Sequence, residues 1–119
     1  MTTLTATELL VTIAEPTRLR IINCLAVAPL FVSDLQAILD LPQPTVSRHL
    51  TVLRTAGVVR DTPVGQFVLY RLRRDGGRGG LISAILDGLA LDEPMKQERH
   101  RALGRSRSRT REVLGRVPA

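Results

Sequence analysis

Side chains that can donate hydrogen bonds gather between residues 43 and 54, a stretch that contains no carboxylate. Within it, Val46, Leu50 and Leu53 recur at spacings of four and three, which is typical of the buried stripe of a helix. The other positions carry hydroxyls, an amide, an imidazole and two guanidinium groups, which suit the base edges and phosphates of the DNA major groove. The candidate DNA-binding residues of this segment are Gln43, Thr45, Ser47, Arg48, His49, Thr51 and Arg54.

The same pattern has a plainer interpretation, the solvated face of an ordinary amphipathic helix. An average protein surface mixes charges of both signs, whereas this chain has no acidic residue between Asp40 and Asp61. This imbalance favours contact with DNA, where residues near the start of a recognition helix are the ones that reach base edges. The expected base readers are Gln43, Thr45, Ser47 and Arg48, while His49 and Arg54 are expected to touch phosphate or to pack.

A helix over residues 44–56 must hold these side chains in place, and the sequence marks both of its ends. Pro44 suits the first helical position, where its missing N–H costs nothing, and Gly57 suits the left-handed residue that closes a helix. A capping box at residues 33–36 opens a shorter helix just upstream, so the pair makes a helix-turn-helix. Capping and proline signals nearer the N-terminus predict helices over residues 6–14 and 16–27.

A β-hairpin is expected after the helix-turn-helix. Residues 58–62 and 66–72 are rich in branched and aromatic side chains, and the turn at residues 63–65 contains proline and glycine. Such a hairpin would form the wing of a winged helix and meet the DNA backbone or minor groove, although a merely solvated hairpin would look the same. The candidate contact residues of the wing are Arg60, Gln66 and Arg71.

The predicted fold is mainly α-helical with one β-hairpin, a winged helix-turn-helix with five helices in each subunit of a dimer. The fifth helix is expected over residues 81–89, whose apolar face is too wide to be left in water. We expect this helix to pair with the first helix and with its own copy in a second subunit. The chain of 119 residues is expected to form one domain over residues 1–91, followed by a basic, flexible tail over residues 92–119.

The chain carries a net charge of +6 and has a pI of about 11.2, which indicates a polyanionic partner. Two blocks hold the positive charge, residues 41–74 and residues 93–119, each with a net charge of +5. In the second block arginine alternates with small polar residues over 104–111, a composition that predicts disorder or a frayed helix. The tail could embrace DNA, bind an acidic partner protein or keep the protein in solution, and the sequence does not choose among these.

Composition disfavours several classes of protein. Cys24 is the only cysteine, so no intrachain disulfide can form; we expect a buried structural thiol and a reducing compartment. No apolar run approaches the roughly 20 residues of a membrane span, and the N-terminus lacks the features of a secretory signal. We therefore expect a cytoplasmic protein with no membrane partner. Two scattered histidines, without a nucleophile motif or a phosphate loop, indicate that the protein is not an enzyme.

Four short segments of the sequence resemble the ArsR/SmtB family of bacterial winged-helix repressors, and they occur in the same order as in that family. Residues 15–21 resemble the opening of that family's second helix, and residues 43–50, which read QPTVSRHL, closely resemble its recognition helix. Residues 58–60 and 65–72 resemble its wing. The resemblance covers about residues 4–91 and leaves the tail uncovered.

This resemblance implies a homodimeric repressor that binds a two-fold symmetric operator in double-stranded DNA and responds to an inducer, commonly a metal ion. The family's thiolate site on the third helix has two cysteines flanking a valine, but here Phe31 and Ser33 flank Val32, so that site is absent. Another family site, on the fifth helix, uses an Asp followed two residues later by a His, but here Leu89 follows Asp87. The remaining candidate metal ligands are Asp87, Glu98 and His100.

Two alternatives for the control of this regulator stay open. In one, a divalent ion such as nickel or zinc binds near the fifth helix and the tail, around His100. The donor set there is incomplete for a tetrahedral zinc site. In the other, a protein partner controls the regulator, with the basic tail as its binding surface.

Overall fold

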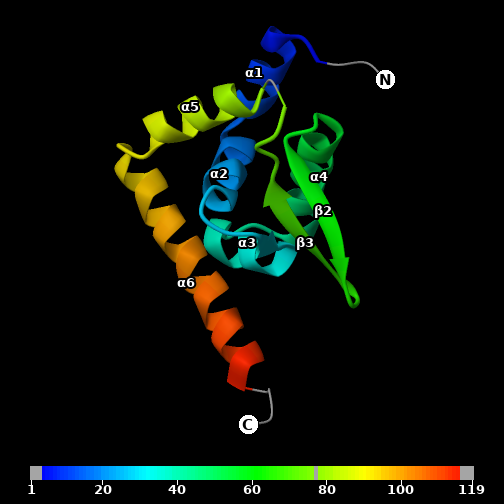
Figure 1. Cartoon of the computed structure of the whole chain (residues 1–119), viewed down its shortest axis with the longest axis vertical. Coiled ribbons are helices and arrows are strands. Elements are labelled where there is room, and N and C mark those ends of the chain that lie inside the picture. The colour runs from blue at the N-terminus through cyan, green and yellow to red at the C-terminus, as the bar shows by residue number, and fades with distance from the viewer. Residues whose placement is uncertain (1–3, 77, 116–119) are drawn as a thin grey trace.

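The computed structural model describes residues 4–76 and 78–115 of the chain. A β-hairpin lies at one edge of the molecule, and the last helix runs along the opposite side (Figure 1). The elements in chain order are α1 (Ala6–Ala14), α2 (Pro16–Leu25), β1 (Leu30–Phe31), α3 (Val32–Leu39), α4 (Gln43–Thr55), β2 (Val59–Val64), β3 (Phe67–Leu72), α5 (Gly79–Leu89) and α6 (Glu93–Gly115).

The sheet has three antiparallel strands in the order β1-β3-β2. The expected hairpin is present as β2 and β3, which pair from Val59 with Leu72 to Val64 with Phe67 at the turn. Gly65 has a φ of 62° in that turn, a conformation that favours glycine. The third strand was not expected, because β1 has only two residues and its pairing with β3 depends on chain folding rather than on a local pattern.

The core lies beneath α4 and joins the helices to the sheet, with Ile82 and Leu86 of α5 and Ala102 of α6 among its members. Val46, Leu50 and Leu53 of α4 have no exposed surface, so the predicted apolar stripe is confirmed. Gly57 has a φ of 77° just after α4, as expected of the left-handed residue that closes a helix. The buried stripe turns the polar face of α4 outward.

Five predicted helix boundaries shift by one or two residues, among them the end of α4 at Thr55 rather than 56 and the start of α5 at Gly79 rather than 81. α2 ends at Leu25 rather than at 27. α4 begins at Gln43, which places Pro44 at the second helical position. α3 begins before Ser33, and its cap is the Asp34 carboxylate, which accepts a 2.8 Å hydrogen bond from the N–H of Phe31.

The expected count of five helices is wrong, because the segment that we expected to be a basic tail contains a sixth, α6. It packs along α2 and α3 (Figure 1). Among the described side chains of α6, Ala102 and Glu98 are buried, and several polar contacts join the helix to its neighbours. Arg99 donates to the buried Asn23 side chain at 2.6 Å, and the Asn23 amide donates to the carbonyl of Met95 at 2.9 Å. The docking of α6 depends on one small residue and on polar and charged groups. The sequence of α6 therefore has no regular spacing of apolar residues that would predict it.

Among the described residues, none of the helices has the length and apolar character needed to cross a membrane.

Candidate nucleic-acid interface

The outward face of α4 carries hydroxyl, amide and guanidinium groups in a partly fixed arrangement. Gln43 donates from Nε2 to the Ser47 hydroxyl at 2.8 Å, and the Thr51 hydroxyl donates to the Ser47 carbonyl at 3.0 Å. Thr45 and Ser47 are half-exposed, whereas Arg48 is exposed and makes no hydrogen bond or ion pair with another described residue. The N-terminal half of α4 therefore presents oriented polar groups beside one guanidinium that is free to bind an anion.

His49 faces the start of α2 rather than solvent, with only 12% of its side chain exposed. Its Nδ1 lies 3.6 Å from the Glu15 carboxylate and 3.4 Å from a terminal nitrogen of Arg18. Burial lowers the pKa of His49; the Glu15 carboxylate opposes this effect, and Arg18 and Arg48 reinforce it. Most of the His49 side chain is thus packed against the start of α2 in this structure.

Two of the candidate arginines are paired with acidic residues. Arg54 lies 3.0 Å from the Asp61 carboxylate, and Arg60 lies 2.8 Å from that of Asp75. All four side chains are at least one-third exposed, so solvent screens both ion pairs and each adds little to stability. Such weak pairs can exchange for DNA phosphates at small cost. Gln66 and Arg71 are exposed on the hairpin, in keeping with a role in a wing.

An aromatic contact joins the hairpin tip to the start of α3. Phe67, whose residue surface is 63% exposed, packs edge-to-face on Phe31 with ring centroids 6.2 Å apart. On the other side, the guanidinium of Arg109 from α6 lies 4.7 Å from the centroid of the Phe31 ring. The sequence analysis missed this chain of contacts, because residues that far apart in the sequence show no spacing pattern.

The candidate metal ligands do not come together. Asp87 and His100 are exposed, on α5 and α6. Glu98 is buried and accepts hydrogen bonds from Arg20 on both carboxylate oxygens, the shortest at 2.6 Å. In the described part of the chain, no group of three or more His, Cys, Asp and Glu side chains is placed to hold a metal ion.

The surroundings of Cys24 also keep its thiol unreactive. It lies fully buried in α2, and burial raises its pKa to about 12. A thiol with this pKa stays protonated at neutral pH, whereas the thiolate is the reactive form.

A helix-turn-helix followed by a β-hairpin, with the second helix turned outward by its buried stripe, defines a winged helix-turn-helix protein. The chain is similar in structure to HlyU from Vibrio cholerae N16961, with a TM-score of 0.59 and 32% sequence identity. That similarity covers 65% of this chain and 83% of HlyU.

Residues 15–61 match the family described as "Bacterial regulatory protein, arsR family". The HTH-type transcriptional regulator KmtR of Mycobacterium tuberculosis is 33% identical over 92 residues, which cover 77% of this chain and 70% of KmtR. The chain belongs to the arsR family of bacterial regulatory proteins. Since this is a family of transcriptional regulators, the expectation that the protein is not an enzyme is confirmed.

Another relative is the biofilm growth-associated repressor of Agrobacterium fabrum, which is 43% identical over 67 residues. The match covers 56% of this chain and 57% of that repressor. The chain thus spans little more than half the length of this curated relative.

Proposed function

We propose that the protein is a homodimeric, sequence-specific DNA-binding transcriptional repressor whose α4 enters the major groove. The observation that carries this proposal is the outward face of α4, which presents donors and no acid and is fixed by the fully buried Val46, Leu50 and Leu53. Family membership supports it, and so does the Agrobacterium relative, which is named as a repressor.

The residues of α4 and the wing divide into two roles in this proposal. Gln43, Thr45, Ser47 and Arg48 lie at the N-terminal half of α4 and read base edges. The wing and the end of α4 bind phosphates, and Arg54 and Arg60 exchange their present carboxylate partners for them. The phosphate-binding candidates are Thr51, Arg54, Arg60, Gln66 and Arg71.

Two copies are needed to read a two-fold symmetric operator, with their α4 helices about 34 Å apart. The first and fifth helices offer the surface for this pairing. Leu10 and Val11 of α1 are 44% and 65% exposed, and Leu81 of α5 is 37% exposed. Large apolar side chains exposed together are typical of a surface that another chain covers.

The test is the double variant Ser47→Ala with Arg48→Ala, measured against DNA selected by the wild-type protein from a random duplex library. Each lost base contact costs about 1–3 kcal/mol, so affinity for the selected DNA is expected to fall about 100-fold or more. The dimer is expected to persist in analytical ultracentrifugation, because both side chains point away from the core.

Lys96→Ala is the matched control, since it removes one positive charge from an exposed position on α6. Its affinity is expected to stay within about threefold of wild type, because the lost charge is not at the proposed interface. Wild-type affinity in the double variant, or an equal loss in the control, would overturn the assignment of α4.

A further inference from the structure

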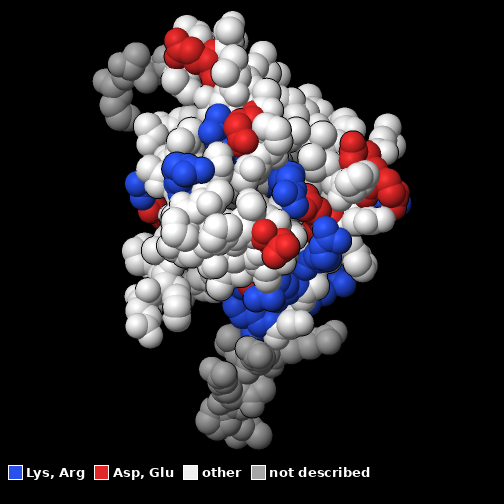
Figure 2. Space-filling view, turned by 180° about the vertical axis from the view of Figure 1, so that it is seen from behind, with Lys and Arg blue, Asp and Glu red and all other residues white. Residues whose placement is uncertain are grey.

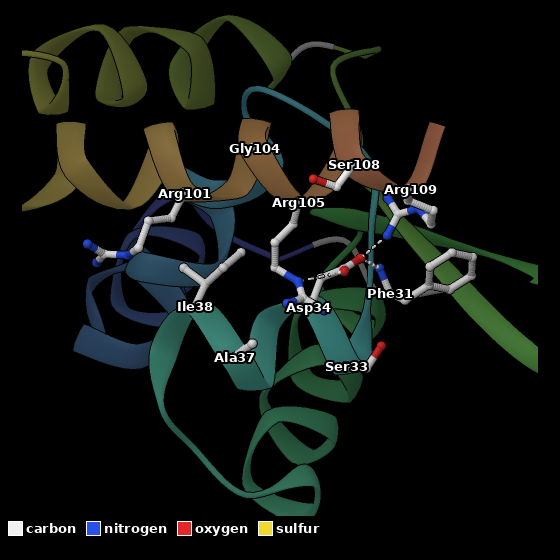
Figure 3. A pocket seen from close by; sticks show the side chains of 10 residues that line it. All are labelled: Phe31, Ser33, Asp34, Ala37, Ile38, Arg101, Gly104, Arg105, Ser108 and Arg109. Atoms are coloured by element: carbon white, nitrogen blue, oxygen red, sulfur yellow. Dashed lines mark hydrogen bonds and ion pairs between the residues drawn. The ribbon is translucent and has the colours of Figure 1, made fainter. Parts of the chain in front are cut away.

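A cavity of about 700 Å³ lies between α3 and α6, on the side of the helix-turn-helix away from the proposed base readers. In Figure 3, Arg105 extends from α6 towards Asp34 on α3, whereas Arg101 ends on the other side of Ile38, turned away from Arg105. The volume falls in the range of small-molecule binding sites. Three guanidinium groups and one carboxylate line the cavity, which gives its walls a net charge of +2. Its electrostatics therefore favour an anion.

The Asp34 carboxylate in the cavity wall already accepts hydrogen bonds on both of its oxygens. Its residue surface is 4% exposed, and Oδ1 accepts a 2.9 Å hydrogen bond from Nε of Arg105. Oδ2 accepts hydrogen bonds from the N–H of Phe31 and from Arg109 (Figure 3). With both oxygens occupied, Asp34 holds Arg105 and Arg109 in place and leaves other donors of the cavity unused.

The unused donors belong to Arg101 and Arg105. Within the described residues, the terminal nitrogens of Arg105 make no hydrogen bond, and its side chain is 45% exposed. Arg101 lies 3.8 Å from Glu98, a carboxylate that Arg20 binds far more closely at 2.6 Å. Arg105 therefore offers its two terminal guanidinium nitrogens to the cavity, a geometry that can bind a carboxylate through two parallel hydrogen bonds.

The rest of the lining is apolar or open. Ala37 and Ile38 of α3 form an apolar wall, and the Phe31 ring closes one end. Gly104 lies in the middle of α6, where glycine costs helix stability, and a Cβ built there would meet nothing within 4 Å. An inorganic anion would leave the apolar wall in water, whereas a flat apolar body would cover it.

We propose that this cavity binds a small aromatic carboxylate, whose charged group lies against Arg105 and whose ring lies on Ala37 and Ile38. Since α3 leads directly into α4, a ligand held between α3 and α6 also changes DNA affinity. This second step rests on the function proposed above, whereas binding of the carboxylate does not.

The direct test is a titration of the full chain with 2-naphthoate, followed by the fluorescence of the probe. The protein has no tryptophan, so its own fluorescence interferes little. Saturable binding at one site per chain is expected, with the neutral 2-naphthamide at least tenfold weaker and inorganic phosphate unable to displace the probe at equal concentration. Unsaturable binding, or equal affinity for the amide, would overturn the proposal.

Two variants locate the site and one serves as a control. Gly104→Leu fills the open space with a better helix former, so it is expected to abolish binding while the melting temperature is unchanged or raised. Arg105→Gln is expected to weaken binding at least tenfold. Arg107→Gln removes the same charge from an exposed position of α6 that does not line the cavity, and it is expected to bind as wild type. Equal losses in Arg105→Gln and Arg107→Gln would show general charge attraction and overturn the site.

The coupling is tested by repeating the DNA titration of the wild-type protein with saturating 2-naphthoate. A change in affinity of threefold or more, absent in Gly104→Leu, is expected. An unchanged affinity would overturn the coupling to α4. Because the probe titration contains no DNA, a failure of the proposed DNA binding cannot be mistaken for a failure of the cavity.

Discussion

At the scale of single residues, Asp34 shows how one side chain serves several elements. It caps α3 through the N–H of Phe31 and binds two arginines of α6. Burial by itself raises the pKa of Asp34, but the hydrogen bonds from Phe31, Arg105 and Arg109 outweigh burial and hold that pKa below its usual value of 3.8. The ionised carboxylate therefore stabilises the fold.

Replacement of Asp34 by Asn is expected to lower the free energy of unfolding by about 1–3 kcal/mol at pH 7, since the variant keeps the shape but loses the charge. A group whose pKa is lower in the folded state stabilises above its unfolded pKa, and the effect is lost as the pH falls through the folded value. The difference between wild type and variant is therefore expected to be full above about pH 5 and to shrink below about pH 4. Urea denaturation across this pH range measures it.

Asp87→Asn provides the control, because Asp87 is exposed and its carboxylate makes no hydrogen bond with another described residue. This variant is expected to match wild type within about 0.5 kcal/mol. A pH-independent loss in Asp34→Asn would contradict the role assigned to its charge.

At the scale of elements, α6 is held by position-specific polar contacts more than by apolar area. Its side chains reach α2 through Arg99 and Glu98, and α3 through Arg105 and Arg109. Figure 2 shows basic side chains gathered at the lower end of the molecule, where the described side chains of α6 end. Some of the arginines that the sequence analysis assigned to a flexible tail thus form ion pairs within the protein.

Ala102→Leu tests the docking of α6, because Ala102 has no exposed surface in the interface. Overpacking is expected to cost about 1–3 kcal/mol of unfolding free energy and to make α6 more susceptible to trypsin. Gln97→Leu introduces the same residue at an exposed position of α6 and is expected to change stability by less than about 0.5 kcal/mol. Similar denaturation midpoints for the two variants would argue against a docked α6.

At the scale of the whole molecule, the proposed dimer surface and the hairpin tip lie at opposite ends. Figure 1 shows α1 and α5 at one end and the tip of the β2–β3 hairpin pointing away from them. Two copies joined through α1 and α5 would carry their hairpins outward, where each can follow the DNA beyond the groove that its α4 occupies.

Val11→Glu is expected to raise the dimer dissociation constant about 100-fold or more, because dimerisation would bury an unpaired carboxylate. Sedimentation equilibrium over a range of protein concentrations measures this constant. Val64→Glu places the same charge on the hairpin, where the valine is 45% exposed, and is expected to leave the dimer intact. A monomeric wild type, or equal dissociation constants for the two variants, would contradict the proposed interface.

The sequence by itself determined the local elements and the polar face of α4. Helix caps, the four-and-three spacing of Val46, Leu50 and Leu53, and the glycine at position 57 act over a few residues, so they can be read in order along the chain. The absence of acidic residues from 41 to 60 can be read along the chain in the same way, and it marked the surface that we propose contacts DNA. How each polar group of that face is used depends on neighbours such as Glu15 and Asp61, which only folding brings near.

Only the tertiary structure decided the place of α6, the strand β1 and the cavity beside α3. Asp34 meets Arg105 and Arg109 across 71 and 75 residues of chain, and Asn23 meets Arg99 across 76. Ion pairs and the burial of a single alanine leave no periodic trace, because they depend on which distant groups the fold brings into contact. A segment that looked like a charged tail was therefore a docked helix, and its arginines, placed against α3, line a cavity that no local pattern could predict.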